Sequence, residues 1–153
     1  MTAYLVDTNV LLRFVKPDDR DYPLVRSAVH ELWTAGENLC HTSQNLAEFW
    51  NTCTRPAERN GYGVSIPEVD RRARRVEDQL TFLEDSKAVH LEWRKSVVAH
   101  SVSGAQVHDA RLVAAMHVHR VTHLLTFNTR DFVRYTGIVP VHPQRVERSP
   151  QQP

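Results

Sequence analysis

The sequence predicts an α/β domain of three layers, in which helices cover both faces of a central, mainly parallel β-sheet. Short apolar runs alternate with longer helical stretches, which favours parallel strands joined by helices. The 153 residues suit one domain, and a domain of that size buries roughly 70% of its unfolded surface. We expect about five strands, at residues 4–6, 39–41, 87–91, 124–127 and 138–141.

Helical stretches separate these runs, and proline marks several of their ends. Pro17 ends the first helix, because proline disrupts a helix interior. Ser65 and Pro67 begin the fourth, since proline already has the conformation of a first helical turn. The helices are expected at residues 9–15, 22–35, 44–53, 67–83, 93–99, 106–119 and 129–135, with bounds uncertain by about 2–4 residues.

The composition indicates where the folded domain ends and in which cellular compartment we expect the protein. The folded domain is predicted over residues 1–141, and residues 142–153 are predicted to be a disordered tail because they are poor in apolar side chains. Cys40 and Cys53 match no zinc or paired-thiol spacing, so we expect buried thiols in a reducing cytoplasm. The N-terminus lacks the pattern of a signal peptide, and no apolar run is long enough to cross a membrane.

The charge content neither favours nor excludes a nucleic-acid partner. Apolar residues at 41% and charged residues at 24% are ordinary for a globular protein. The formal net charge is +1, but a neutral sum can hide an acidic cleft beside a basic rim.

Two aspartates begin helices in the predicted fold. Asp7 follows the first strand directly, at the edge where open parallel sheets bind ligands. A helix cap is the equally weighted alternative for Asp7. Asp109 shares a helix face with Leu112, Val113 and Met116, and an acid on an apolar face is costly unless something compensates it. The start of the helix offers backbone N–H groups and a favourable dipole, so a structural first-turn aspartate is the alternative there.

Three further polar side chains are candidates. Glu48 lies opposite the apolar stripe of its helix, which equally describes a solvated glutamate. Asn128 and Asp131 follow the fourth strand, three residues apart, where an ordinary turn is the alternative. Together, Asp7, Asp109 and Asp131 are expected at one end of the sheet, where a cation relieves their repulsion. Hard oxygen ligands without thiolates suit Mg²⁺ or Mn²⁺, and such metals activate water for displacement at phosphorus.

The sequence resembles a known family at this point. VDTNVLL, AEFW, HDARLVAAM and LLTFNTRDF occur in the order and spacing of PIN-domain nucleases, and are most similar to VapC-like toxins of bacterial type II toxin–antitoxin pairs. The likeness covers about residues 3–141. By this resemblance Asp7, Glu48, Asp109 and Asp131 occupy the places of the family's acidic quartet. Asn9, Thr126 and Asn128 would support it, although the family often has an acid where Asn128 stands.

The resemblance implies a specific activity and specific partners. It implies a three-layer PIN-like domain that hydrolyses RNA with Mg²⁺, held by Asp7, Asp109 and Asp131, and leaves a 5′-phosphate and a 3′-hydroxyl. Glu48 would complete the site directly or through water. The resemblance further implies a homodimer and a small antitoxin protein that fills the acidic cleft with a basic side chain.

Other functions find less support in the residues. The rival class is a PIN-like module that binds RNA or protein without cleaving. A Mg²⁺ phosphatase with Asp7 as nucleophile usually needs an acid two residues later, where this chain has Asn9. Nucleotide-cofactor and serine-hydrolase motifs are missing from the sequence, and the histidines show no zinc-site spacing. The arginines at 71, 72, 74 and 75 are expected to form a salt-bridged face, with a rim for RNA or a protein as the alternative.

Overall fold

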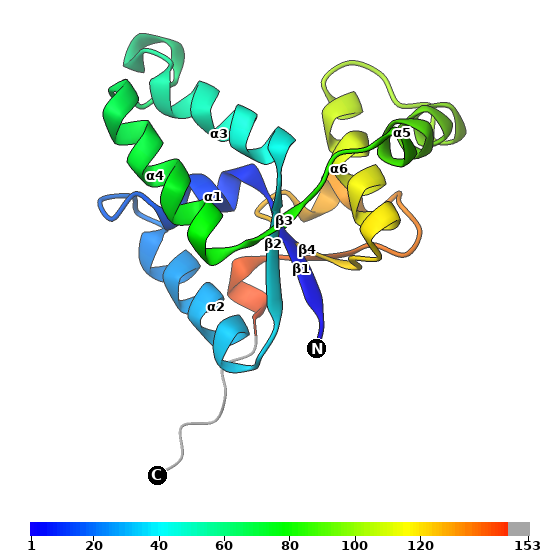
Figure 1. Ribbon diagram of the computed structural model, residues 1–153, viewed down its shortest axis with the longest axis horizontal. Coiled ribbons are helices and arrows are strands. Elements are labelled where there is room, and N and C mark those ends of the chain that lie inside the picture. Colours follow the sequence, from blue (N-terminus) through cyan, green and yellow to red (C-terminus); the bar gives the residue numbers. More distant parts are fainter. Residues whose placement is uncertain (147–153) are drawn as a thin grey trace.

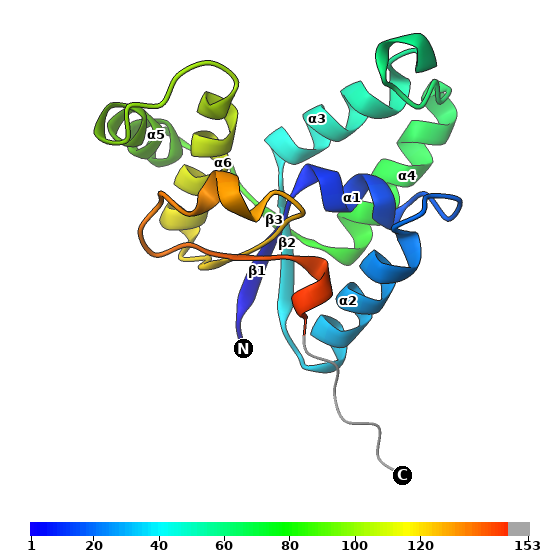
Figure 2. The same cartoon turned by 180° about the vertical axis from the view of Figure 1, so that it is seen from behind.

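The computed structural model describes residues 1–146 and has the predicted three-layer α/β/α architecture (Figures 1 and 2). Its sheet has the strand order β3-β2-β1-β4-β5, and every neighbouring pair is parallel. The central strand β1 has β2 on one side and β4 on the other. The chain therefore adds β2 and β3 on one side of β1 before it crosses to form β4 and β5 on the other side. The strands are β1 (Ala3–Val6), β2 (Asn38–Thr42), β3 (Thr81–Leu83), β4 (His123–Leu125) and β5 (Val139–Val141).

Six α-helices form the outer layers of the described chain. The ribbon separates into two arms above the sheet, with α3 and α4 in one arm and α5 and α6 in the other (Figure 1). Three short 3₁₀ helices, η1 (Ala57–Arg59), η2 (Thr129–Phe132) and η3 (Pro143–Arg145), lie in the connections. The helices are α1 (Thr8–Phe14), α2 (Tyr22–Thr34), α3 (Ser43–Thr54), α4 (Ile66–Gln79), α5 (Lys87–Ala99) and α6 (Gln106–His119).

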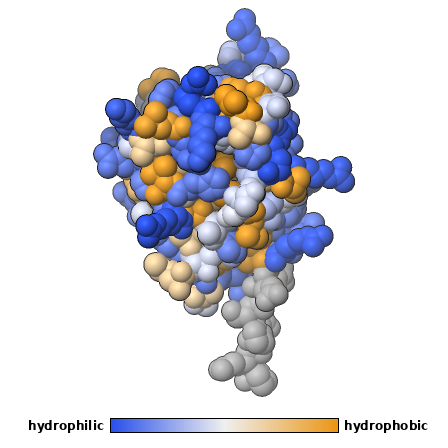
Figure 3. Space-filling model, turned by 90° about the vertical axis from the view of Figure 1, so that its right-hand side faces the viewer, coloured by the Kyte–Doolittle hydropathy of each residue, from blue (hydrophilic) through white to orange (hydrophobic). Residues whose placement is uncertain are grey.

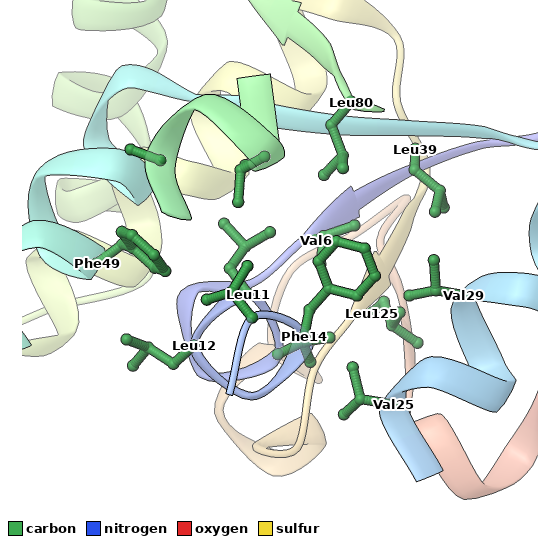
Figure 4. Close-up of a cluster of buried hydrophobic side chains, with 14 of the residues drawn as sticks. Val6, Leu11, Leu12, Phe14, Val25, Val29, Leu39, Phe49, Leu80 and Leu125 are labelled. Atoms are coloured by element: carbon green, nitrogen blue, oxygen red, sulfur yellow. The ribbon is translucent and has the colours of Figure 1, made fainter. Parts of the chain in front are cut away.

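The sheet separates two apolar cores because successive side chains of a strand point to opposite faces. Val6 of β1 packs with the core that α1 to α4 cover, whereas Leu5 packs with the core beneath α6. Leu124 and Leu125 of β4 divide in the same way. Figure 4 shows the first core, where side chains of α1 and α2 meet those of the sheet. Side chains on both faces of the inner strands β1 and β4 are therefore buried, as expected for a parallel sheet covered by helices on both sides.

The prediction of a strand at residues 87–91 was wrong. Residues 87–91 form the first turns of α5, where the Ser86 hydroxyl accepts a hydrogen bond from the Val89 backbone at 3.3 Å and so caps the helix. The actual strand is β3, which the sequence placed inside a helix predicted over 67–83. β3 has three residues and pairs with β2. Three residues are too few to show a hydrophobic period in the sequence. The segment is a strand because it pairs with β2.

The C-terminal end of the domain also differs from the prediction. The helix predicted over 129–135 is the 3₁₀ helix η2. Within the tail predicted to be disordered, residues 143–145 form η3, where Pro143 is buried and η3 contacts α2. Residues 147–153 of that tail lie outside the described residues.

The surface carries scattered apolar side chains (Figure 3). Leu91 and Val98 of α5 and Phe82 of β3 are the large exposed ones among these elements. Both cysteines are buried and free, as predicted. In residues 1–146, no helix combines the length and the apolar character needed to cross a membrane.

We expect Phe49→Ala to destabilise the domain by about 3–5 kcal/mol, because Phe49 is fully buried in the first core and its loss leaves a cavity. Phe82→Ala removes the same side chain from an edge strand, where Phe82 is 53% exposed, and should cost much less. Denaturant unfolding of both variants measures the difference, and equal losses of stability would contradict this assignment of the core.

Candidate active site

The candidate site lies where β1 and β4 end. The Asp7 backbone N–H donates to the Leu125 carbonyl at 2.9 Å, and the Thr126 N–H donates to the Val141 carbonyl at 3.0 Å. These bonds continue the parallel ladders one residue past each strand. The backbones at Asp7 and Thr126 are therefore fixed side by side at the carboxyl edge of the sheet, where open α/β sheets bind ligands.

Asp7 caps α1 and also lines the pocket described below, so a capping role and a place in a site are compatible for this residue. Its Oδ1 accepts from the Thr8 backbone N–H at 2.8 Å, and its Oδ2 accepts from the Thr126 hydroxyl at 2.8 Å. Asp7 is 7% exposed, and Thr126 is fully buried. One donor to each oxygen fixes the carboxylate plane and leaves lone pairs on both oxygens for a ligand.

Glu48 is held in the site by two donors, unlike a solvated helix glutamate. The Thr8 hydroxyl donates to its Oε2 at 2.8 Å, and the Gln44 amide donates to its Oε1 at 2.9 Å. Thr8 in turn accepts from the buried Asn45 amide at 3.3 Å. Asn45 also completes a capping box with Thr42 at the start of α3. The α3 cap and the acidic site thus share one hydrogen-bond network.

Gln44 connects the two arms of the molecule. Its Nε2 also donates to the backbone carbonyl of His108 at 2.8 Å, beside Asp109 at the start of α6. Its Oε1 is buried without a hydrogen-bond partner in the described residues. Gln44, Thr8 and Asn45 are not among the site residues that the sequence predicts. For Gln44 one signal existed, because it lies four residues before Glu48 on the same helix face.

The remaining acidic candidates differ in their placement. Asp109 lies in the first turn of α6, half-buried, and its carboxylate has no hydrogen-bond partner in residues 1–146. Asp131 is exposed on η2 and does not line the pocket described below, whereas Asn128 does. Asp131 is nevertheless close enough for its charge to act on Asp7 and Asp109.

An open pocket of about 340 Å³ joins these side chains. It collects residues from α1, α3, the start of α6 and the segment after β4, which come from distant parts of the chain. Of the acidic residues predicted from the sequence, it brings together Asp7, Glu48 and Asp109. The lining consists of Asp7, Thr8, Asn9, Leu12, Glu48, Asn51, Thr52, Asp109 and Asn128.

Burial, together with neighbouring carboxylates, raises the pKa values of two aspartates in the pocket. The pKa of Asp7 rises to about 6, chiefly because burial disfavours its charge, with smaller contributions from Glu48 and Asp131. The hydrogen bonds from Thr126 and Thr8 oppose that rise. The pKa of Asp109 also rises to about 6, first through burial and then through repulsion by Asp7, Asp131 and Glu48. Both shifts indicate a site where added positive charge is favourable.

The donors fit a hard divalent cation that keeps part of its water shell. All the acidic side chains and amides of the pocket offer oxygen, and no thiol lines it. Across residues 1–146, no three His, Cys, Asp or Glu side chains are spaced as direct ligands of one ion. Mg²⁺ commonly retains several waters and is bound by one or two carboxylates together with substrate phosphates. That mode of binding suits carboxylates that share a pocket without converging on one point.

The arginines of α4 form the salt-bridged face that was expected. Arg72 contacts Glu68 at 3.2 Å, and Arg74 contacts Asp70 at 3.0 Å. Arg71 also pairs with Glu68. Arg75 lies over the ring of Phe14 on α1. Most of this charge is therefore balanced within α4 itself.

Comparisons with known proteins agree with this architecture. A family model for the PIN domain matches residues 4–138. No curated protein matches the chain. Among solved structures, VapBC2 from Rickettsia felis, bound to a DNA fragment from its promoter, has 13% identity and a TM-score of 0.69, covering 92% of this chain and 98% of that one.

Two further solved structures are similar. VapC20 from Mycobacterium tuberculosis, described as a sarcin–ricin loop cleaving toxin, has 14% identity and a TM-score of 0.56, covering 79% of this chain and 86% of that one. A toxin–antitoxin complex from Klebsiella pneumoniae has 18% identity and a TM-score of 0.57, with 89% and 95% covered. At sequence identities this low, the structural similarity establishes a shared fold and nothing further.

The raised pKa of Asp109 predicts a pH-dependent stability for the metal-free protein. The folded state binds the proton more tightly than the unfolded state, so ionisation destabilises the fold as pH rises from about 4 through 6. Asp109→Asn keeps the shape and cannot ionise. In EDTA at pH 7.5 we expect its melting temperature to exceed that of wild type by about 2–4 °C, the shift that about 1 kcal/mol gives in a domain of this size, with a much smaller difference at pH 4.

The control for this experiment is Glu58→Gln, which neutralises an exposed carboxylate away from the pocket. Its melting temperature should follow that of wild type at both pH values. Asp109→Asn could instead be less stable than wild type by the same amount at pH 4 and pH 7.5. That result would show that Asp109 stabilises the N-terminus of α6 and that its charge does not destabilise the fold.

Proposed function

The chain belongs to the PIN domain family, and from this premise we propose that it is a Mg²⁺-dependent endoribonuclease, the toxin of a toxin–antitoxin pair. The observation that carries the proposal is the pocket at the carboxyl edge of the sheet, where Asp7, Glu48 and Asp109 gather. Carboxylates with raised pKa values in one pocket are costly to maintain. A site that attracts a divalent cation accounts for that cost, because a bound cation removes the repulsion.

In the proposed site Asp7, Asp109 and Asp131 would hold Mg²⁺, or Mn²⁺ in its place, and Glu48 would complete the set directly or through water. Such a cation supplies Lewis acidity toward a phosphate group and makes nearby water more acidic. The exposed position of Asp131 suits a ligand that acts through water, and Asn128 offers an amide oxygen in the pocket itself. Asn9, Thr126 and Asn128 are the supporting groups in this proposal.

The surrounding residues prepare the carboxylates for this role. Thr126 and Thr8 orient the Asp7 carboxylate, and Thr8 with Gln44 orients that of Glu48. Because these donors are already in place, little reorganisation is needed when the substrate arrives. A held carboxylate can accept a proton from an attacking water. Water would then add to phosphorus as the bond between phosphorus and the 3′-oxygen of the preceding nucleotide breaks. The leaving oxygen would take up a proton from solvent, which gives a 5′-phosphate and a 3′-hydroxyl.

The proposed partners follow from the family and from its similar structures. One of those structures is named a toxin–antitoxin complex and another a cleaving toxin, which supports a cognate antitoxin and an RNA substrate for this chain. We further propose a homodimer that acts in the cytoplasm. A basic antitoxin side chain in the acidic pocket would neutralise the same repulsion that the cation relieves.

Cleavage of single-stranded RNA by the purified protein should require Mg²⁺ or Mn²⁺ and stop in EDTA. Asp7→Asn should lower the rate at least about 100-fold, because it removes a charge from the point where the proposed cation and substrate meet. Glu58→Gln, which changes an exposed carboxylate elsewhere, should cleave like wild type. Full activity of Asp7→Asn in EDTA would rule out the proposed mechanism.

Induced expression of the wild-type chain alone should arrest bacterial growth, and co-expression of the protein encoded next to it should restore growth. Asp7→Asn, expressed to the same level, should permit growth, since the proposed toxicity depends on cleavage. Growth curves with immunoblots of protein level make the measurement. Normal growth in the presence of abundant wild-type protein that cleaves RNA in vitro would exclude the toxin role while keeping the nuclease.

A further inference from the structure

The pocket extends beyond its acidic residues into a second half without charge. Leu12 on α1 lies one turn beyond Thr8, and Asn51 and Thr52 on α3 lie one turn beyond Glu48. The hydrogen bond between Thr8 and Glu48 therefore marks the point where the acidic half ends. One helical turn rises about 5 Å, so the second half begins about that far from the carboxylates. We call this second half, formed by Leu12, Asn51 and Thr52 with Asn9 at its border, the amide half, after its two asparagines.

The size of the pocket suits a small organic group. The pocket offers about 340 Å³, which falls within the range of small-molecule sites. The space beside Asn9, Leu12, Asn51 and Thr52 is lined there by no carboxylate or basic group. An uncharged organic group fits that space better than a second ion.

The side chains of the amide half keep unused hydrogen-bonding capacity. Among the described residues, the Asn51 amide and the Thr52 hydroxyl have no partner. By contrast, Thr54 on the same helix donates to the Trp50 carbonyl at 2.8 Å. Asn9 accepts from the Phe127 N–H at 3.4 Å through its Oδ1, and its amide hydrogens are unpaired in residues 1–146. These groups offer adjacent donors and acceptors to a ligand.

The small exposed part of the Leu12 side chain adds an apolar edge to this half of the pocket. Leu12 contributes to the lining and is 8% exposed. A nucleobase has the matching character, because its faces are apolar and its edge carries donors and acceptors. Unpaired RNA bases are recognised in this way, through their edges and their faces. A carboxamide can pair with a base edge through two hydrogen bonds, and its pattern of donor and acceptor distinguishes one base from another.

From these observations we infer that the amide half is a nucleoside subsite, in which Asn51 reads the edge of the unpaired base next to the scissile phosphate. The inference rests on the proposed ribonuclease function, because it places the phosphate at the carboxylates. Asn51 acts here as a specificity residue, and Leu12 supports the face of the base. Asn51 is exposed in the absence of a ligand, so its role in folding is small.

Binding of the four nucleoside 5′-monophosphates tests this inference without any cleavage. These ligands carry the base and the 5′-phosphate of the proposed product. We expect calorimetric or NMR titrations of the full chain in Mg²⁺ to show one nucleotide bound about tenfold more tightly than the weakest, as one bidentate pairing predicts. Asn51→Ala should bring the four affinities close together with an unchanged melting temperature. Gln79→Ala removes an exposed amide from α4, outside the pocket, and should keep the preference.

The outcomes separate this inference from the proposed function. Equal affinities for the four nucleotides, no binding of any of them, or a preference that survives Asn51→Ala would overturn the nucleoside subsite. RNA cleavage by the same preparation reports on the nuclease independently. A protein that cleaves RNA without base preference keeps the nuclease and loses the subsite, whereas nucleotide preference without cleavage keeps the subsite and loses the nuclease.

Discussion

The buried carboxylate of Asp7 is the constraint on which the arrangement of this molecule depends. A charged group removed from water is destabilising unless hydrogen bonds or opposite charge compensate it. Here the compensation comes from the N-terminus of α1 through Thr8 and from the end of β4 through Thr126. Both donors exist only when β1 and β4 are paired in register and α1 begins immediately after β1. The hydrogen bonds to this one carboxylate therefore hold the ends of β1 and β4 and the start of α1 in their relative positions.

The second determinant is the way α3 and α6 are connected across the site. These helices belong to different arms, and the ribbon separates them above the sheet (Figure 2). Gln44 spans the gap with one amide nitrogen, which donates both to Glu48 and to the His108 carbonyl. The position of Glu48 relative to Asp109 therefore depends on this amide as well as on the core. The buried Oε1 that Gln44 leaves without a partner in the described residues indicates that the bridge is kept at some energetic cost.

Repulsion and rigidity act together in the site. The same hydrogen bonds that orient Asp7 oppose the rise of its pKa, so its charge is partly stabilised before any ligand binds. Asp109 has no such donors in the described residues, and its pKa rises through burial and the neighbouring acids. The two aspartates therefore reach similar pKa values from different environments. A cation or a basic side chain that enters the pocket would favour the charged form of both aspartates.

The sequence by itself determined the parallel α/β class, because short apolar runs at 4–6, 39–41 and 124–127 alternate with helical stretches long enough to connect parallel strands. It also determined the placement of Asp7, since a residue that directly follows a central strand has one available edge of the sheet. Tertiary structure alone decided β3, whose three residues become a strand only through pairing with β2. It also decided which acids share the pocket, because Gln44 and His108 meet across 64 positions of sequence while Asp131 stays outside. Local pattern encodes what each segment must bury, whereas contacts between distant segments depend on how the buried faces pack.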